Sequence, residues 1–149
     1  MRRRQFVTLI GGGAVAWPLV ARGQQPAMPV IGYLSSRSAE SDAAMLVAVR
    51  RGLNETGYVE GRNLAIEYRF ADALYDRLPA LLTELTRRQV AVILFGGLAP
   101  GVSSALSQQV RASPVPIVFN VGSDPVQAGI VDSMNRPGGN ATGIATLSG

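Results

Sequence analysis

The chain has 149 residues, 47% hydrophobic and 16% charged, which predicts one globular domain with a real core and not a disordered segment. The net charge of +4 arises in the first 23 residues, which hold four of the 14 Arg; the other 10 balance the 10 Asp and Glu, so no nucleic-acid partner is expected. With neither Cys nor His, the sequence excludes thiol chemistry, disulfides, zinc sites built from those residues and a Ser-His-Asp triad.

The first 23 residues resemble an export signal. They begin with a short cationic stretch, continue with the apolar run Val7–Val20, and end with small residues suited to cleavage after Gly23. Arg3, Arg4 and Phe6 match the twin-arginine pattern, which predicts passage through the twin-arginine export machinery. A general secretory signal and an uncleaved anchor are the alternatives, although the run is short for a membrane span of roughly 20 residues. We therefore expect a bacterial protein of the periplasm or cell surface.

After this segment, apolar runs alternate with stretches of helical periodicity. Five strands are expected, at residues 30–34, 64–70, 90–95, 115–119 and 141–147, the second with the alternation of an edge strand. Four helices are expected between them: one capped by Ser41 or Asp42 and stopped by Gly57, one capped by Asp76 with Pro79 in its first turn, one at about 102–111, and one at about 125–135 that Arg136–Asn140 stops.

Strand-helix alternation of this kind predicts an α/β fold. The strands should form a mostly parallel, doubly wound sheet with right-handed crossovers, covered by helices on both faces. The expected architecture is a three-layer sandwich of the flavodoxin-like or Rossmann-like type.

Three loops should leave this sheet at one edge, because parallel strands all end on the same side. They contain the candidate binding residues Ser35, Ser36, Gly96, Gly97, Leu98, Asn120, Ser123 and Asp124. Glycines let a ligand approach the backbone, whereas serine hydroxyls and the N–H groups of helix starts favour anionic groups such as carboxylates. Neither a catalytic base with a partner nor a metal-binding cluster is evident, so the edge is expected to bind without catalysis, metal or cofactor.

Structural interpretations of the same residues remain open. Asp124 before Pro125 has the form of a helix cap, which is the favoured interpretation; contact with a ligand amine, alone or together with capping, is the alternative. The two serines are also typical of capping or solvated positions, and the glycine pair is typical of turns. Tyr33 is either a core residue or a stacking partner for a ligand.

Several connected motifs carry a family resemblance. These are Ile31–Ser35 (Ile-Gly-Tyr-Leu-Ser), Arg51–Asn63, Asp76–Leu81, Gly122–Val126 and Arg136–Gly143. Together they resemble the ABC-transporter substrate-binding proteins of the tryptophan/tyrosine-binding-like group, which have the type I periplasmic binding protein fold. The resemblance covers residues 24–149.

The resemblance implies a two-lobed, non-catalytic protein that closes over a small solute, in some members an aromatic amino acid, and delivers it to an ABC permease. It places residues 24–140 in the N-terminal lobe, residues 141–149 at the start of the crossing to a second lobe, and the eight loop residues on the cleft wall. The chain is therefore expected to be a one-lobe fragment. A ligand-sensing domain of a receptor and, less favoured, an exported hydrolase are the alternatives.

Overall fold

The computed structural model describes residues 28–98 and 103–146. The predicted signal residues Arg3, Arg4 and Phe6 and the cleavage after Gly23 lie outside these ranges, so the export signal stays a prediction. Within the described ranges, no helix has the length and apolar character that crossing a membrane requires.

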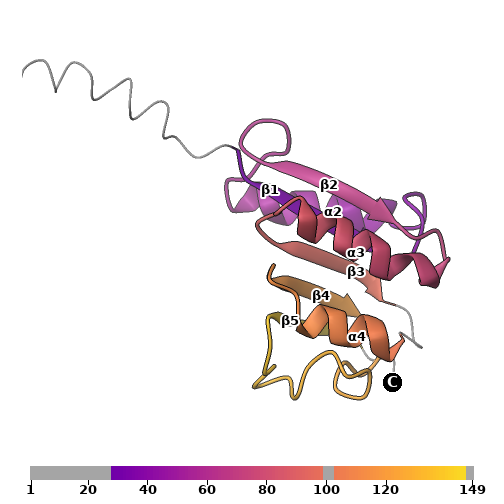
Figure 1. Cartoon of the computed structure of the whole chain (residues 1–149). Helices are drawn as coiled ribbons and strands as arrows, with labels where there is room; N and C mark the ends of the chain where they lie inside the picture. Colours follow the sequence, from indigo (N-terminus) through magenta and orange to yellow (C-terminus); the bar gives the residue numbers. More distant parts are fainter. Residues whose placement is uncertain (1–27, 99–102, 147–149) are drawn as a thin grey trace, which may run out of the picture.

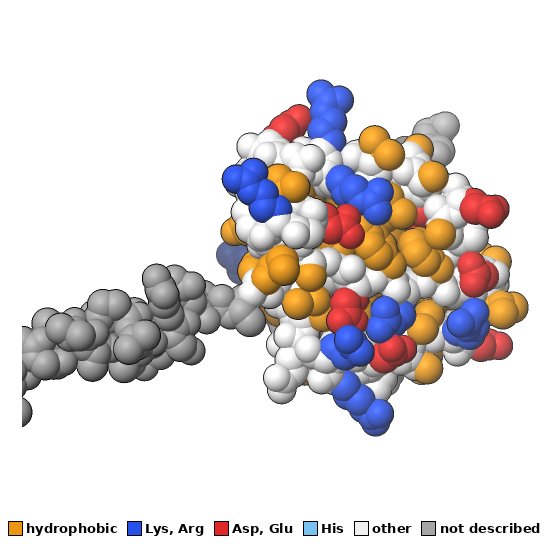
Figure 2. All heavy atoms as spheres, turned by 90° about the horizontal axis from the view of Figure 1, so that it is seen from above, with side chains coloured by type: hydrophobic (Ala, Val, Ile, Leu, Met, Phe, Trp, Pro, Cys, Tyr) orange, Lys and Arg blue, Asp and Glu red, His pale blue; other side chains and the backbone are white. Residues whose placement is uncertain are grey.

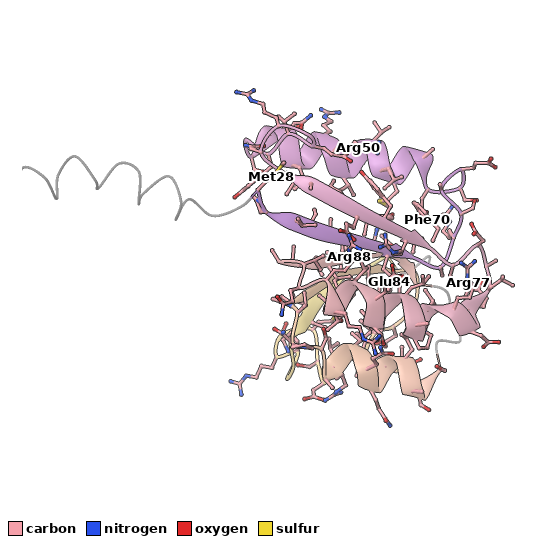
Figure 3. The ribbon with its side chains drawn as sticks, turned by 45° about the horizontal axis from the view of Figure 1, so that its top comes forward. Met28, Arg50, Phe70, Arg77, Glu84 and Arg88 are labelled. Atoms are coloured by element: carbon pink, nitrogen blue, oxygen red, sulfur yellow. The ribbon has the colours of Figure 1, made fainter. Side chains whose placement is uncertain are left out.

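Five parallel strands form one sheet in the order β2-β1-β3-β4-β5 (Figure 1). The strands are β1 (Val30–Ser35), β2 (Ala65–Phe70), β3 (Ile93–Leu98), β4 (Ile117–Val121) and β5 (Ala141–Ala145). The helices are α2 (Ala43–Glu55), the short 3-10 helix η1 (Tyr75–Arg77), α3 (Leu78–Arg87) and α4 (Ser104–Arg111). Helix α2 covers one face and α3 with α4 the other (Figures 1 and 3). The predicted doubly wound α/β fold is confirmed, and β2 is an edge strand as expected.

The main hydrophobic core lies between the sheet and the helices α3 and α4. Alternate residues of the central strands point to this side, and the leucines and valine of the two helices meet them. All of the following are at most 2% exposed: Leu34, Ile93, Phe95, Ile117, Phe119, Leu78, Leu82, Leu85, Leu106 and Val110. The predicted leucine stripe of α3 is therefore confirmed for Leu78, Leu82 and Leu85, with Leu81 packed at its margin.

The edge of the sheet at β2 is bordered by paired charges. Figure 2 looks down on this side and shows Arg and Asp or Glu side chains interspersed around an apolar centre. Nη2 of Arg69 on β2 lies 2.8 Å from Oε1 of Glu84 on α3, and Nε of Arg88 lies 2.6 Å from Oε2 of Glu67 on β2. Figure 3 shows Glu84 of α3 and Arg88, the residue after α3, on the side toward β2. Charges of both signs on an edge strand discourage pairing with a further strand.

The cap predicted for the second helix is wrong. Asp76 lies within η1, and the residue preceding α3 is Arg77, without a side-chain capping bond. The 3-10 turn leads directly into α3, so Asp76 is placed in the turn instead of at the cap position. Pro79 does occupy the first turn, as predicted.

Strand β3 starts later than predicted. It begins at Ile93, not Val90, and it continues through Gly96 and Gly97. Gln89 adopts φ +54 at the end of α3, and the following residues return the chain to the sheet before regular pairing begins. The glycine pair that was expected in a loop is therefore part of a strand, with a register shift between Gly96 and Leu98.

The fourth predicted helix, at 125–135, is also wrong. The chain makes one turn, in which the N–H of Ala128 donates to the carbonyl of Asp124 at 3.0 Å. Gly129 then takes φ +73, a left-handed conformation that ends helical winding. The next two residues, Ile130 and Val131, are each 2% exposed and pack into the core. Tertiary burial of these β-branched side chains therefore replaces the expected helix.

Candidate ligand-binding edge

The carboxyl ends of β1, β3 and β4 converge on one hollow of about 310 Å³. Its described lining consists of Ser36, Arg37, Asp42, Met45, Gly97, Asn120, Gly122 and Thr146. This volume is at the lower end of the roughly 300–1,000 Å³ typical of small-molecule sites. The hollow is open to solvent, as one wall of a larger site would be.

The two glycines of β3 are required by side chains of β1 and of the loop that follows it. A Cβ at Gly96 would lie 2.5 Å from the hydroxyl of Tyr33, and one at Gly97 would lie 2.8 Å from Cδ of Arg37. Gly97 also has φ +63, which disfavours a larger residue. The Ser36 hydroxyl donates to the carbonyl of Gly97, so the β1 loop is fastened directly to β3.

Asp42 precedes α2 at the cap position, but its side chain makes no capping bond. Its carboxylate is instead turned toward the site: Oδ2 accepts from the hydroxyl of Tyr33 at 3.0 Å, and Oδ1 lies 3.4 Å from Nε of Arg37. The side chain of Asp42 is 1% exposed and that of Arg37 is 52% exposed. The pKa of Tyr33 is raised well above its usual value. The larger cause is burial of the side chain, and the next is its hydrogen bond to Asp42.

At the end of β4, the Asn120 side chain is half-buried. The hydroxyl of Thr146, which follows β5, lies 3.5 Å from Oδ1 of Asn120 and 3.4 Å from the carbonyl of Val121, and it can donate to either. These contacts place Thr146, the last described residue, at the same edge of the sheet as the loop after β1.

The Asp124 carboxylate caps the single turn that follows β4. Its Oδ1 accepts the N–H groups of Val126 at 2.9 Å and Gln127 at 3.3 Å. The predicted capping role is therefore confirmed in its geometry, although the capped element is one turn and not a helix. Asp124 and Ser123 are half-buried and are not among the residues that line the hollow. Their contact with a ligand stays a prediction.

Of the remaining predicted residues, Ser36, Gly97 and Asn120 line the hollow. Ser35 is 0% exposed, and its hydroxyl oxygen accepts the N–H of Arg37 at 3.1 Å, so it shapes the loop. Gly96 borders a second groove, described next. Leu98 is the last residue of β3, and its side chain lies outside the described part.

The second groove has a volume of about 280 Å³ and an almost wholly apolar lining. It runs beside α2 over the face of β3, β4 and β5 that no described helix covers, and it shares Met45 and Asn120 with the hollow. Its most exposed apolar side chains are Val118 (40%) and Ile144 (61%). A polar hollow and an apolar groove thus adjoin at the sheet edge.

Sequence reasoning missed Arg37, Asp42 and Thr146 as site residues. Arg37 follows the two candidate serines in the same loop, so its position directly after a strand was a usable signal. For Asp42 the cap motif suggested a different role, and for Thr146 only the pairing of β5 with β4 reveals its position. Over residues 28–98 and 103–146, no group of three or more Asp or Glu is placed to hold a metal ion.

Comparison with known families decides the identity. Residues 29–148 match the family described as ABC transporter substrate binding protein. The chain belongs to this family. Over 95 residues it is 27% identical to a tyrosine-binding protein of Clostridioides difficile (strain R20291), a match that covers 64% of this chain and 26% of that protein.

Solved structures agree with this assignment. A substrate-binding protein with adhesive properties from Clostridium difficile, in its ligand-free open form, matches with a TM-score of 0.68 at 21% identity, over 80% of this chain and 39% of that one. A domain from Streptococcus pneumonia in complex with L-Trp matches with a TM-score of 0.67 at 20% identity, over 81% of this chain and 39% of that one. A conserved domain protein from Vibrio cholerae matches with a TM-score of 0.62 at 28% identity, over 82% of this chain and 40% of that one. At 21% and 20% identity, the first two matches show that the fold is shared. The chain thus spans about two fifths of the solved proteins and a quarter of the curated relative.

Proposed function

We propose that this chain forms one wall of the solute site of an exported ABC-transporter substrate-binding protein. The observation that carries the proposal is the convergence of three strand ends on one hollow, which contains Ser36, Gly97 and Asn120. Ligands of open α/β sheets bind at this edge. The predicted absence of catalysis accords with a family of binding proteins, in which the site holds the solute and releases it unchanged.

The proposed solute is an amino acid with an aromatic side chain. Two observations support this choice: the polar hollow adjoins an apolar groove, and a relative is named for tyrosine while a structural neighbour holds L-Trp. The hollow would receive the polar end of the solute. Delivery to an ABC permease in the inner membrane completes the proposed role.

The binding test compares two proteins. We expect the 149-residue chain to bind L-tryptophan or L-tyrosine weakly, because an open hollow cannot enclose the 70–90% of the ligand surface that a complete site buries. A two-lobed protein carrying this lobe should bind one of these amino acids tightly, since hinge closure supplies the second wall. Isothermal titration calorimetry measures both. Micromolar binding by this chain alone would contradict the requirement for a second wall.

The export test uses the signal residues. Replacing Arg3 and Arg4 with Lys should leave the precursor in the cytoplasm, because the twin-arginine machinery reads the arginine pair. Cell fractionation followed by immunoblotting measures the distribution. Unchanged export of the double variant would indicate the general secretory route instead.

A further inference from the structure

We propose that Arg37 is the residue that recognises an anionic group of the ligand, namely its carboxylate, and that Asp42 and Tyr33 position it for this purpose. The inference rests on the proposed function in taking the hollow as the ligand site. It adds the chemical group that the hollow selects and the residue that selects it.

Arg37 supplies the single positive charge among the described residues that line the hollow. Three contacts hold it in place: Nε lies 3.4 Å from Oδ1 of Asp42, Nη2 donates to the carbonyl of Ser41 at 3.1 Å, and the aliphatic stem lies over Gly97. A guanidinium fixed in this way loses little conformational freedom when a ligand arrives, which favours binding. The side chain remains 52% exposed, so a ligand can reach it.

The Asp42 carboxylate does not compete with a ligand for the outer side of the guanidinium. It is 1% exposed, and its two oxygens face Tyr33 and Nε of Arg37. Arginine has five N–H donors in a planar fork. Both N–H groups of Nη1 in Arg37 lack a partner within the described part of the chain. This side of the guanidinium is thus available for the charge-assisted pairing that arginine makes with carboxylates.

One further polar group of the hollow favours an anion, the side-chain amide nitrogen of Asn120. The hydroxyls of Ser36 and Thr146 have no donor left for a ligand, because the proton of Ser36 is donated to the carbonyl of Gly97 and that of Thr146 to Asn120 or Val121. The Nδ2 group of Asn120 has no acceptor among the described residues, so it is a second available donor. The hollow therefore offers strong donors, while the carboxylate of Asp42 is already paired. A ligand carboxylate satisfies these donors, and a ligand amine does not.

The test uses NMR on the 149-residue chain, which detects weak binding. The Nε–H resonance of Arg37 is followed during titration, at constant ionic strength, with acetate, indole-3-propionate, tryptamine and L-tryptophan. We expect acetate and indole-3-propionate to shift this resonance, and tryptamine, which has the ring and amine but no carboxylate, to leave it unchanged. Absence of a shift with every carboxylate, or an equal shift with tryptamine, would overturn the proposal. Because this comparison uses the unaltered chain, it does not depend on the folding of any variant.

Two variants add a quantitative measure. Arg37→Gln should weaken indole-3-propionate binding about ten- to a hundredfold, the usual effect of losing a charged hydrogen bond, and Arg37→Lys should have an intermediate effect because it keeps the charge without the fork. The matched control is Arg51→Gln on α2, whose arginine is 81% exposed and contacts Glu55. It should bind as the unaltered chain does.

The outcomes separate the two proposals. If acetate and indole-3-propionate shift the Nε–H resonance of Arg37 but L-tryptophan does not bind, the role of Arg37 stands and the aromatic amino-acid assignment fails. If L-tryptophan binds with equal affinity to the unaltered chain and to Arg37→Gln, the assignment stands and the role of Arg37 is refuted.

Discussion

At the scale of single residues, Asp42 shows how a local motif can be used by the tertiary structure. Its position before α2 is that of a helix cap, yet its carboxylate turns away from the helix and contacts Tyr33 and Arg37. A carboxylate that is almost fully buried requires such partners, since an unpaired buried charge is costly. The contact links β1, its loop and α2 at the position where the hollow begins.

The Tyr33 hydroxyl should therefore contribute to stability. Tyr33→Phe removes the donor to Asp42, and we expect a loss of about 1–3 kcal/mol in the free energy of unfolding at neutral pH, because a buried acceptor is left without its partner. Urea denaturation measures the loss. Tyr75→Phe, at an exposed position, serves as the control and should have little effect. Equal stability of the two variants would contradict the inferred role.

The same residue predicts a dependence on alkaline pH. Burial and the hydrogen bond to Asp42 raise the pKa of Tyr33 in the folded state. An unfolded tyrosine ionises at a pH of about 10, so above that pH the unfolded state releases its proton first and becomes favoured. The contribution of Tyr33 is complete below pH of about 10 and is lost as the pH rises toward the folded pKa. Denaturation curves of Tyr33→Phe should show a shallower alkaline decline than those of Tyr75→Phe.

At the scale of elements, the turn after β4 shows why a helix signal can fail. Asp124 and Pro125 provide a good start, and the capping bonds do form. Gly129 ends the winding after one turn, and the next two residues pack into the core. Arg111 of α4 then pairs with Asp132, which secures the rest of the connection to β5.

Two substitutions of Asp124 separate capping from charge. Asp124→Ala should lower the free energy of unfolding by about 0.5–1 kcal/mol, because the N–H groups of Val126 and Gln127 lose their acceptor. Asp124→Asn should preserve stability, since an amide oxygen also caps. Thermal denaturation followed by circular dichroism measures both. Equal stability of Asp124→Ala and the unaltered chain would contradict the capping role. Loss of amino-acid binding by Asp124→Asn in a two-lobed protein would show that the carboxylate also meets the ligand amine.

At the scale of the whole molecule, the two faces of the sheet differ. Helices α3 and α4 cover the core face, whereas α2 lies on the other face and leaves the apolar side chains of Val118 and Ile144 exposed. Contiguous exposed apolar surface promotes association. The matched relatives are longer, and this chain corresponds to about two fifths of the solved ones.

This face should make the chain prone to self-association. Ile144→Thr should reduce association while keeping strand propensity, because it removes exposed apolar surface from β5. The control is Val47→Thr, at a 63% exposed position of α2 that does not line the groove. Sedimentation velocity at several concentrations measures both variants. Identical behaviour of the two would show that the groove does not drive association.

The sequence alone determined the features that depend on local periodicity and on backbone restrictions. Apolar runs located all five strands, their alternation with helical segments predicted the parallel sheet, and Gly57 ended α2 with φ +93 as expected. Shared direction of the strands then placed Ser36, Gly97 and Asn120 at one edge, where the structure finds them.

Only the tertiary structure decided which partner each polar group takes. The carboxylate of Asp42, the packing of Arg37 on Gly97 and the single turn before Gly129 all depend on residues distant along the chain or on burial in the core. Sequence propensity reflects only the conformational preference of an isolated segment. At these positions the tertiary contacts contribute more to the free energy of folding. For that reason the sequence could place the edge and Arg37 in the loop after β1, whereas the contacts that hold its positive charge at the hollow could not be predicted.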